Sequence, residues 1–331
     1  MTASSSASPD DPDSSSSRPK TSWRVAQTVF LIAALAYTAR QVATNWTTVK
    51  ASATNMHANW GLILGASCIV MLTYAALIQS WRVLIAGEGS SLQFLSAARI
   101  WFIANLGRYI PGKVWSIAAL NVMAAREGVP GTAAAGAAVL GTLINIGAGF
   151  GVISLSGSRL MAGLDPVFRG ASVICSVIFV LGVVALPWIL PPTAEWAARR
   201  FGKTAPPVRL PAQNLLTAVS INVLSWFCYG WAFMVFSHAV MPGVTGTLAQ
   251  FTGVWTASYT LGYLAFFAPG GIGVRETTMG VAMVGLGMAS VGDAALIAGT
   301  SRLWLSLVEV LPGLIALLCS PASRRLRSEG R

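Results

Sequence analysis

Charged residues are scarce in this sequence of 331 residues. Asp, Glu, Lys and Arg make up 10% of it, whereas hydrophobic residues make up 54%. A soluble globular protein carries about 25% charged residues. The scarcity of charge therefore excludes an ordinary soluble domain, and the long apolar runs between the charges predict an all-α polytopic membrane protein.

Cysteine and histidine are also rare, with 4 and 2 copies. Each cysteine lies singly in an apolar segment without the spacing of metal ligands, so we expect no disulfide framework, metal site or cofactor. The sequence has no GxxxxGK[ST] loop, and we therefore expect no ATP hydrolysis. The net charge of +11 is not arranged as a basic stripe with interleaved aromatic residues, which argues against nucleic-acid binding.

Three regions follow from the distribution of apolar residues. Residues 1–22 are rich in Ser, Pro and Asp and predict a disordered cytoplasmic tail. Residues 23–320 form the transmembrane domain, and residues 321–331 form a basic cytoplasmic tail. Within the domain we expect six full transmembrane helices, at about 25–43, 58–80, 131–156, 170–190, 214–239 and 292–319. The first run also resembles a signal peptide, but the long preceding region with three Asp residues favours an uncleaved span.

Two further apolar regions, 91–126 and 248–290, are each interrupted by a Pro-Gly pair. The breaks are at Pro111, Gly112 and Pro269, and the arms that follow them, Val114 to Ala125 and Thr277 to Ala289, are too short to cross a bilayer. We predict that both regions are re-entrant helical hairpins. Non-helical tips at membrane depth are tolerated only where they are buried in protein or line a wet cavity.

The order span, span, hairpin, span occurs twice, over about 25–156 and 170–319. Three full crossings in each half mean that the second half is inserted upside down, which predicts an inverted 3+3 repeat. The interval from Pro111-Gly112 to Pro269-Gly270 equals that from Gly141-Thr142 to Gly299-Thr300. Most of the 22 Lys and Arg residues fall on one side of this layout, which predicts that both termini are cytoplasmic.

The same layout places four basic residues at membrane depth, where a charge is costly unless it has a function. They are Arg108, Lys113, Arg275 and Arg302. Gly270, Gly271 and Gly273 allow a sharp turn, and the helix that follows offers its N-terminus to an anion. Because Arg275 adds a planar donor fork, we expect the two hairpin tips to bind the phosphate of a lipid head group.

Structural roles for these charges remain open. Arg275 and Glu276 are also compatible with an ion pair that fixes the hairpin, and Glu276 with a partner for the helix N-terminus. Arg108 and Lys113 are also compatible with snorkelling to the interface. Arg302 shares a helix face with Glu309; it binds substrate or belongs to an internal ion pair.

Two segments carry a resemblance to a known family. NLGRYIPGKVW, from Asn105 to Trp115, and APGGIGVRE, from Ala268 to Glu276, resemble the signature segments of the lysylphosphatidylglycerol synthase transmembrane (flippase-like) family of bacterial and archaeal membrane proteins. The resemblance covers about residues 25–320. It implies a flippase-type domain that moves an anionic or aminoacylated phospholipid, or a polyprenyl-phosphate-linked sugar, between the leaflets of the cell membrane.

The resemblance also assigns residues. Those that match the family motifs are Arg108, Pro111, Gly112, Lys113, Pro269, Gly270, Gly271, Gly273, Arg275 and Glu276, and Arg302 with Pro312 resembles the pattern of the last span. Many relatives carry an acidic residue in the span after the first hairpin. This chain has Asn145 as the polar candidate there, so it lacks the carboxylate that such coupling chemistry would need. Glu309 and Asn145 are the candidates for an ion pair or for coupling.

We therefore expect a lipid transporter that is not itself an enzyme. Two-domain relatives append an aminoacyl-transferase domain, for which the short segment after Cys319 has no room, so lipid synthesis would fall to a separate lipid-modifying enzyme. Two other functions remain open: a membrane-embedded enzyme or accessory subunit of a lipid glycosyltransferase system, and a scaffold that transports nothing.

Overall fold

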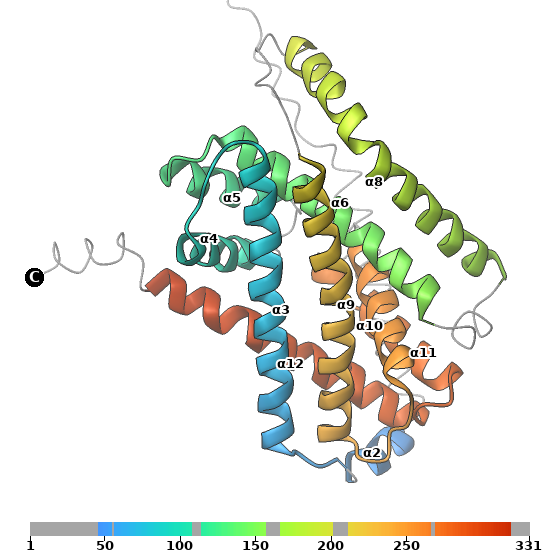
Figure 1. Cartoon of the computed structure of the whole chain (residues 1–331). Helices are drawn as coiled ribbons and strands as arrows, with labels where there is room; N and C mark the ends of the chain where they lie inside the picture. Colours follow the sequence, from blue (N-terminus) through green and yellow to red (C-terminus); the bar gives the residue numbers. More distant parts are fainter. Residues whose placement is uncertain are drawn as a thin grey trace, which may run out of the picture.

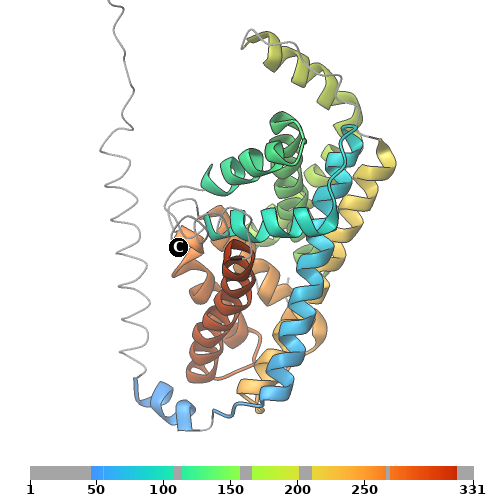
Figure 2. The ribbon, with the colours of Figure 1, turned by 90° about the vertical axis from the view of Figure 1, so that its left-hand side faces the viewer.

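The computed structural model of the chain describes residues 46–54, 56–107, 114–156, 166–200, 211–265 and 269–318. Within these ranges every regular element is a helix and no strand occurs, as the sequence predicts (Figures 1 and 2). The helices are α2 (Trp46–Thr54), α3 (Trp60–Gly87), α4 (Phe94–Leu106), α5 (Val114–Arg126), α6 (Gly131–Leu155), α8 (Pro166–Arg200), α9 (Ala212–Val240), α10 (Leu248–Leu264), η2 (Pro269–Gly271), α11 (Val274–Gly285) and α12 (Val291–Leu318).

Four helices in the described part of the chain, α3, α6, α9 and α12, are long and apolar enough to cross a membrane. Their bounds agree with the spans predicted at 58–80, 131–156, 214–239 and 292–319 to within a few residues, except that α3 continues to Gly87. The predicted span at 170–190 lies within α8, and the one at 25–43 lies outside the described residues. The described residues therefore support a polytopic membrane protein and leave the count of six spans a prediction.

The shorter helices form two pairs, α4 with α5 and α10 with α11. At 1.5 Å per residue the 13 residues of α4 or of α5 rise roughly 20 Å, less than the ~30 Å of a bilayer core. The predicted break at Pro269 falls in η2, and the one at Pro111 and Gly112 lies outside the described residues. Helix α11 begins at Val274, and Glu276 caps its first turn.

Helices α3 and α9 lie side by side and run in opposite directions (Figure 1). At one end the backbone N–H of His57, just before α3, donates to the carbonyl of Val240 at the end of α9, with an N–O distance of 3.0 Å. At the other end the Asn214 side chain near the start of α9 donates to the Val83 carbonyl at 2.8 Å. Contacts at both ends thus hold this antiparallel pair together.

The remaining contacts come in matched sets. Helix α4 packs against α12 and α10 against α6; likewise α5 packs against α6 and α11 against α12. Each set is converted into the other when α3 is exchanged with α9, α4 with α10, α5 with α11 and α6 with α12. In each half the first helix of the short pair therefore packs on the last long helix of the other half, and the second helix packs on the last long helix of its own half.

Large aromatic side chains fill the interior between α3, α9, α10 and α12. Tyr74, Trp226, Phe233 and Trp255 are at most 2% exposed, and their rings contact one another or a shared neighbour within 6.1 Å between centroids. The outward faces of the same long helices carry exposed leucines instead. An apolar exterior around an aromatic core that includes polar groups is typical of a helical membrane protein with an internal site.

Candidate functional site

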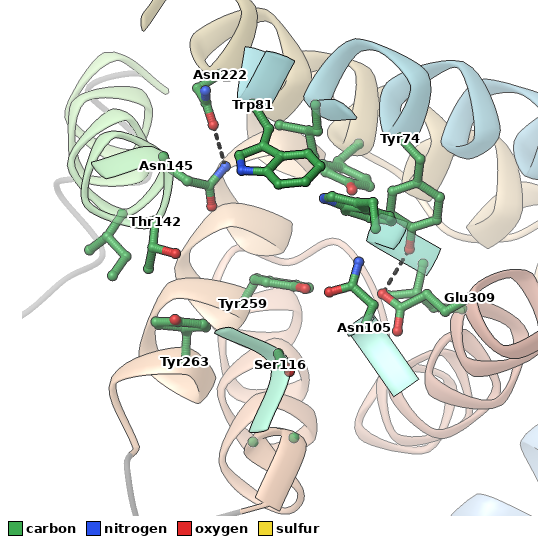
Figure 3. A pocket seen from close by; sticks show the side chains of 18 of the residues that line it. Tyr74, Trp81, Asn105, Ser116, Thr142, Asn145, Asn222, Tyr259, Tyr263 and Glu309 are labelled. Carbon is green, nitrogen blue, oxygen red and sulfur yellow. Dashed lines mark hydrogen bonds between the residues drawn. The ribbon is translucent and has the colours of Figure 1, made fainter. Parts of the chain in front are cut away.

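A cavity of ≈ 270 Å³ lies in this interior, lined by residues from α3, α4, α5, α6, α9, α10, η2, α11 and α12 (Figure 3). Both predicted hairpin regions contribute to it. Aromatic rings such as Tyr74, Trp101, Trp226 and Tyr259 form much of its wall, and three charged side chains, Arg275, Arg302 and Glu309, face it. Helices from both halves of the chain therefore line one cavity.

The turn after Pro269 depends on glycine at three positions. Gly270, Gly271 and Gly273 have φ angles of 59°, 71° and 85°, a backbone conformation that residues with a Cβ atom rarely adopt. A Cβ on Gly271 would also lie 2.8 Å from the carbonyl oxygen of Gly262 in α10. The backbone of the turn therefore packs directly against the backbone of α10, and this close approach places the start of α11 at the cavity.

Arg275 lies in the first turn of α11 and is 5% exposed. Its guanidinium carbon sits 4.5 Å from the ring centroid of Trp255 and 4.8 Å from that of Tyr259, both on α10. The guanidinium makes no salt bridge with the residues that the structure describes, and its buried Nη2 has no hydrogen-bond partner among them. Two aromatic faces hold this cation in place without neutralising it.

Glu276, the next residue, performs the capping role that the sequence left open. Its Oε2 accepts a hydrogen bond of 2.7 Å from the backbone N–H of Gly273, and its Oε1 lies 3.6 Å from Nε of Arg302 on α12. A carboxylate at this position satisfies a free N–H group and complements the positive end of the helix. Arg302 consequently belongs to an ion pair and lines the cavity as well.

Glu309 is placed on the cavity wall two turns further along α12. It is 7% exposed, and its Oε1 accepts a 2.7 Å hydrogen bond from the hydroxyl of Tyr74 on α3 (Figure 3). Tyr74 and Glu309 are far apart in sequence and belong to different halves of the chain. Their bond therefore connects the two halves directly at the cavity.

Asn145 lies on the cavity wall in α6. Its side-chain Nδ2 donates to Oδ1 of Asn222 on α9 at 2.9 Å, and Nδ2 of Asn222 in turn donates to Ser80 and to the carbonyl of Ala218. Asn145 thus belongs to a network of hydrogen-bonded amides, which lies at one end of the cavity, away from Glu309 (Figure 3).

The predicted site residues fall into two groups: those that lie outside the described residues, and those that lie on or beside the cavity. Arg108, Pro111, Gly112 and Lys113 lie outside the described residues, so their roles stay predictions. Gly270, Gly271, Arg275, Arg302, Glu309 and Asn145 line the cavity, Gly273 and Glu276 lie beside it, and Pro269 begins the turn. Among the described residues no group of three His, Cys, Asp or Glu side chains could hold a metal ion.

Sequence reasoning missed the aromatic side chains that hold Arg275. Trp255 and Tyr259 are four residues apart, so they share one face of α10. In an apolar sequence that spacing is equally typical of ordinary core packing. Only the position of α11 against α10 reveals that the two rings face a cation.

A search among curated proteins gave no match. Residues 24–313, most of the sequence, match the family described as the lysylphosphatidylglycerol synthase TM region. The match contains the Pro269 turn, Arg275, helices α3, α6 and α9 and most of α12, so the chain is a multi-pass membrane protein that belongs to the lysylphosphatidylglycerol synthase transmembrane region family.

Proposed function

We propose that this protein is a flippase-like lipid transporter, which moves a lipid between leaflets by holding its phosphate group in the internal cavity. The observation that supports the proposal most is that Arg275 is buried without a salt-bridge partner among the described residues. Arg302 is paired with Glu276, and Glu309 accepts from Tyr74. Among the charged residues that the structure describes on the cavity wall, Arg275 is the cation without a salt-bridge partner.

A buried, uncompensated charge is expensive. Removing a cation from water costs several kcal/mol, which a structure recovers only through a counter-charge and hydrogen bonds. The rings of Trp255 and Tyr259 contribute on the order of 1–2 kcal/mol by cation–π attraction. They leave Nη2 of Arg275 without an acceptor among the described residues. The oxygens of a phosphate would supply both the missing charge and the missing acceptors.

The surroundings of Arg275 favour a lipid over a soluble anion. The helices around the cavity present apolar residues outward, so a guest with acyl or prenyl chains can leave them in the bilayer. A volume of ≈ 270 Å³ is near the lower end of the ~300–1,000 Å³ typical of small-molecule pockets. It suits a head group without its chains. A phosphate is shared by anionic and aminoacylated phospholipids and by polyprenyl-phosphate-linked sugars.

The arrangement of the helices supports movement of this group across the membrane. The exchange of contacts between α4–α12 and α10–α6 supports an inverted repeat whose two short helix pairs are re-entrant hairpins. In transporters of this kind the substrate lies at the interface between repeats, and one half rocks against the other. The distribution of basic residues supports cytoplasmic termini, and the family supports a bacterial or archaeal cell membrane.

Reconstitution tests the proposal directly. The full chain is placed in phosphatidylcholine vesicles that contain a trace of fluorescent phosphatidylglycerol, and dithionite quenches the fluorophores that reach the outer leaflet. We expect the initial rate of translocation to fall by about tenfold or more in Arg275→Gln, because a charge-assisted hydrogen bond contributes about 1.5–3 kcal/mol. Arg126→Gln is the matched control, since Arg126 is exposed at the end of α5, and it should translocate at the unchanged rate.

The same assay separates the alternatives. Equal rates for Arg275→Gln and the unaltered protein would overturn the phosphate-binding role of Arg275. A folded protein with no translocation above that of empty vesicles would favour a scaffold. Turnover of a lipid-linked sugar by the purified chain would favour a membrane-embedded enzyme.

A further inference from the structure

We propose that Oδ1 of Asn145 is the acceptor for a neutral hydroxyl group on the lipid head group, and that Asn222 fixes the Asn145 amide in the orientation this requires. The inference rests on the proposed function, because it concerns the same cavity, and it adds a second point of recognition beyond the phosphate. It assigns Asn145 to specificity and Asn222 to positioning.

The orientation of the two amides follows from one carbonyl group. The backbone carbonyl of Ala218 can only accept a hydrogen bond, so the Asn222 atom that lies 2.8 Å from it must be the nitrogen. That nitrogen also donates to Ser80 at 3.0 Å, which uses its second hydrogen. Asn222 therefore presents its oxygen, a pure acceptor, to Asn145.

The side chain of Asn145 has then no choice of orientation. Facing an acceptor, it must present its own nitrogen, and this is the 2.9 Å bond from Nδ2 of Asn145 to Oδ1 of Asn222. The indole of Trp226 donates to the backbone carbonyl of Asn145 at 3.0 Å and holds this part of α6 against α9. Because Asn222 is 2% exposed, water does not compete for its side of the network.

The remaining atom, Oδ1 of Asn145, is left for the cavity. It has no hydrogen-bond partner among the described residues, and Asn145 is part of the cavity wall. Figure 3 shows the oxygen on the side turned away from Asn222. A guest that fills this end of the cavity must bring a hydrogen-bond donor, since an acceptor or an apolar group would leave the carbonyl oxygen unsatisfied.

The charges of the cavity favour a hydroxyl over an ammonium group as that donor. The neighbours of Asn145 on the wall, Ser80, Thr142 and Asn222, are uncharged. Glu309 lies at the opposite end of the view in Figure 3, and Arg275 and Arg302 line the same cavity. An ammonium group at Asn145 would lose its water without gaining a counter-charge. A hydroxyl loses less and is satisfied by one amide oxygen.

The test is a competition between lipids that differ only beyond the phosphate. The full chain in detergent is equilibrated with equal amounts of phosphatidylglycerol, phosphatidylethanolamine and phosphatidylmethanol with identical acyl chains, and native mass spectrometry measures the bound ratios. Phosphatidylmethanol keeps the phosphate diester but has no donor. We expect about fivefold preference for phosphatidylglycerol over phosphatidylmethanol, the effect of one neutral hydrogen bond, and weaker binding of phosphatidylethanolamine than of phosphatidylglycerol.

Two variants assign the preference to the amides. In Asn145→Leu the ratio should fall to about one while binding of phosphatidylmethanol is retained, which also shows that the variant is folded. Asn222→Leu leaves Asn145 in place but frees its amide to turn, and should lose most of the preference. If Asn145→Leu does not fold, the double variant with Asn222→Leu removes both partners, which is less disruptive than orphaning one.

Each result bears on one claim. Equal binding of phosphatidylglycerol and phosphatidylmethanol by the unaltered protein overturns the role of Asn145, and stronger binding of phosphatidylethanolamine overturns the choice of a hydroxyl. Either result leaves the proposed function standing if Arg275→Gln loses all three lipids. Retention of all three by Arg275→Gln instead overturns the phosphate-binding role of Arg275, on which the proposed function rests.

Discussion

Among the residues that the structure describes, the helix pairs α4–α5 and α10–α11 carry their charged groups at opposite ends. In the first pair Arg99, near the start of α4, forms a salt bridge with Glu127 just after α5, and both side chains are about one-third exposed. In the second pair Arg275 and Glu276 lie at the start of α11, next to the turn and the cavity. An arginine and a glutamate thus form a salt bridge at the end of the first pair that is away from its turn, whereas in the second pair an arginine and a glutamate lie at the turn.

The difference shows that the exposure of a charged side chain to water decides how much its interactions contribute. At the open end water solvates the partners, and such a pair contributes less than about 1 kcal/mol. At the tip Arg275 is 5% exposed, so its charge is costly unless something binds it. The comparison predicts large effects of mutation at the tip of α10–α11 and small effects at the base of α4–α5.

The largest expected effect on stability is at the turn that forms the tip. Gly271→Ala places a Cβ 2.8 Å from the Gly262 carbonyl oxygen at a φ of 71°. Strain of this kind costs on the order of 1–3 kcal/mol before the clash is counted. We expect a clear fall in the thermal unfolding temperature in detergent. Gly280→Ala in α11 is the control, because nothing lies within 4 Å of its added Cβ; unfolding of both variants at one temperature would contradict the prediction.

An intermediate effect is expected when the two acidic residues are compared. Glu276→Ala removes the cap of α11 and the partner of Arg302, and should cost about 1–2 kcal/mol. Glu127→Ala removes the salt bridge with Arg99 and a hydrogen bond from Ser96, and should cost less than about 1 kcal/mol. Thermal unfolding of the two variants side by side measures the difference. Equal losses would show that burial does not separate the two pairs.

The smallest effect concerns Glu88, which follows the end of α3 on the approach to the first pair. Burial raises the pKa of Glu88 to about 7, from an ordinary value of 4.5. The folded state therefore prefers the neutral carboxyl, and stability should fall as the pH rises from about 4.5 to about 7. Because the side chain is partly solvated, we expect a change of about 1 kcal/mol or less.

Glu88→Gln tests this pH dependence. The variant lacks the ionisable group and should lose less stability than the unaltered protein between pH 5 and pH 8. The measurement is the unfolding temperature at the two pH values for both proteins. Parallel changes would show that Glu88 does not titrate in this range.

The long helices could be predicted from the sequence because their lengths are set by the apolar runs. Helix α6 covers 131–155 where the sequence predicted 131–156, and α9 covers 212–240 where it predicted 214–239. The break at Pro269 was equally visible, since Pro-Gly cannot continue a helix. These features depend on local composition, which a sequence displays directly.

The partners of the charged groups were less accessible to sequence reasoning. Arg302 was left between substrate contact and ion pair, and the structure shows that it pairs with Glu276 and faces the cavity. Asn145 was singled out for being polar in an apolar span, but its link to Asn222 was not predicted. Side chains on different helices meet only after the helices pack, and no local spacing encodes that distance.

The sequence by itself determined that the chain is helical, apolar outside and interrupted at Pro269, because hydrophobic length and backbone freedom are properties of short segments. The tertiary structure alone decided that Arg275 rests between two rings without a described salt-bridge partner and that the Asn145 oxygen is left for a guest. The reason is physical: burial and pairing depend on which helices surround a group, and that is fixed only when the halves of the chain come together.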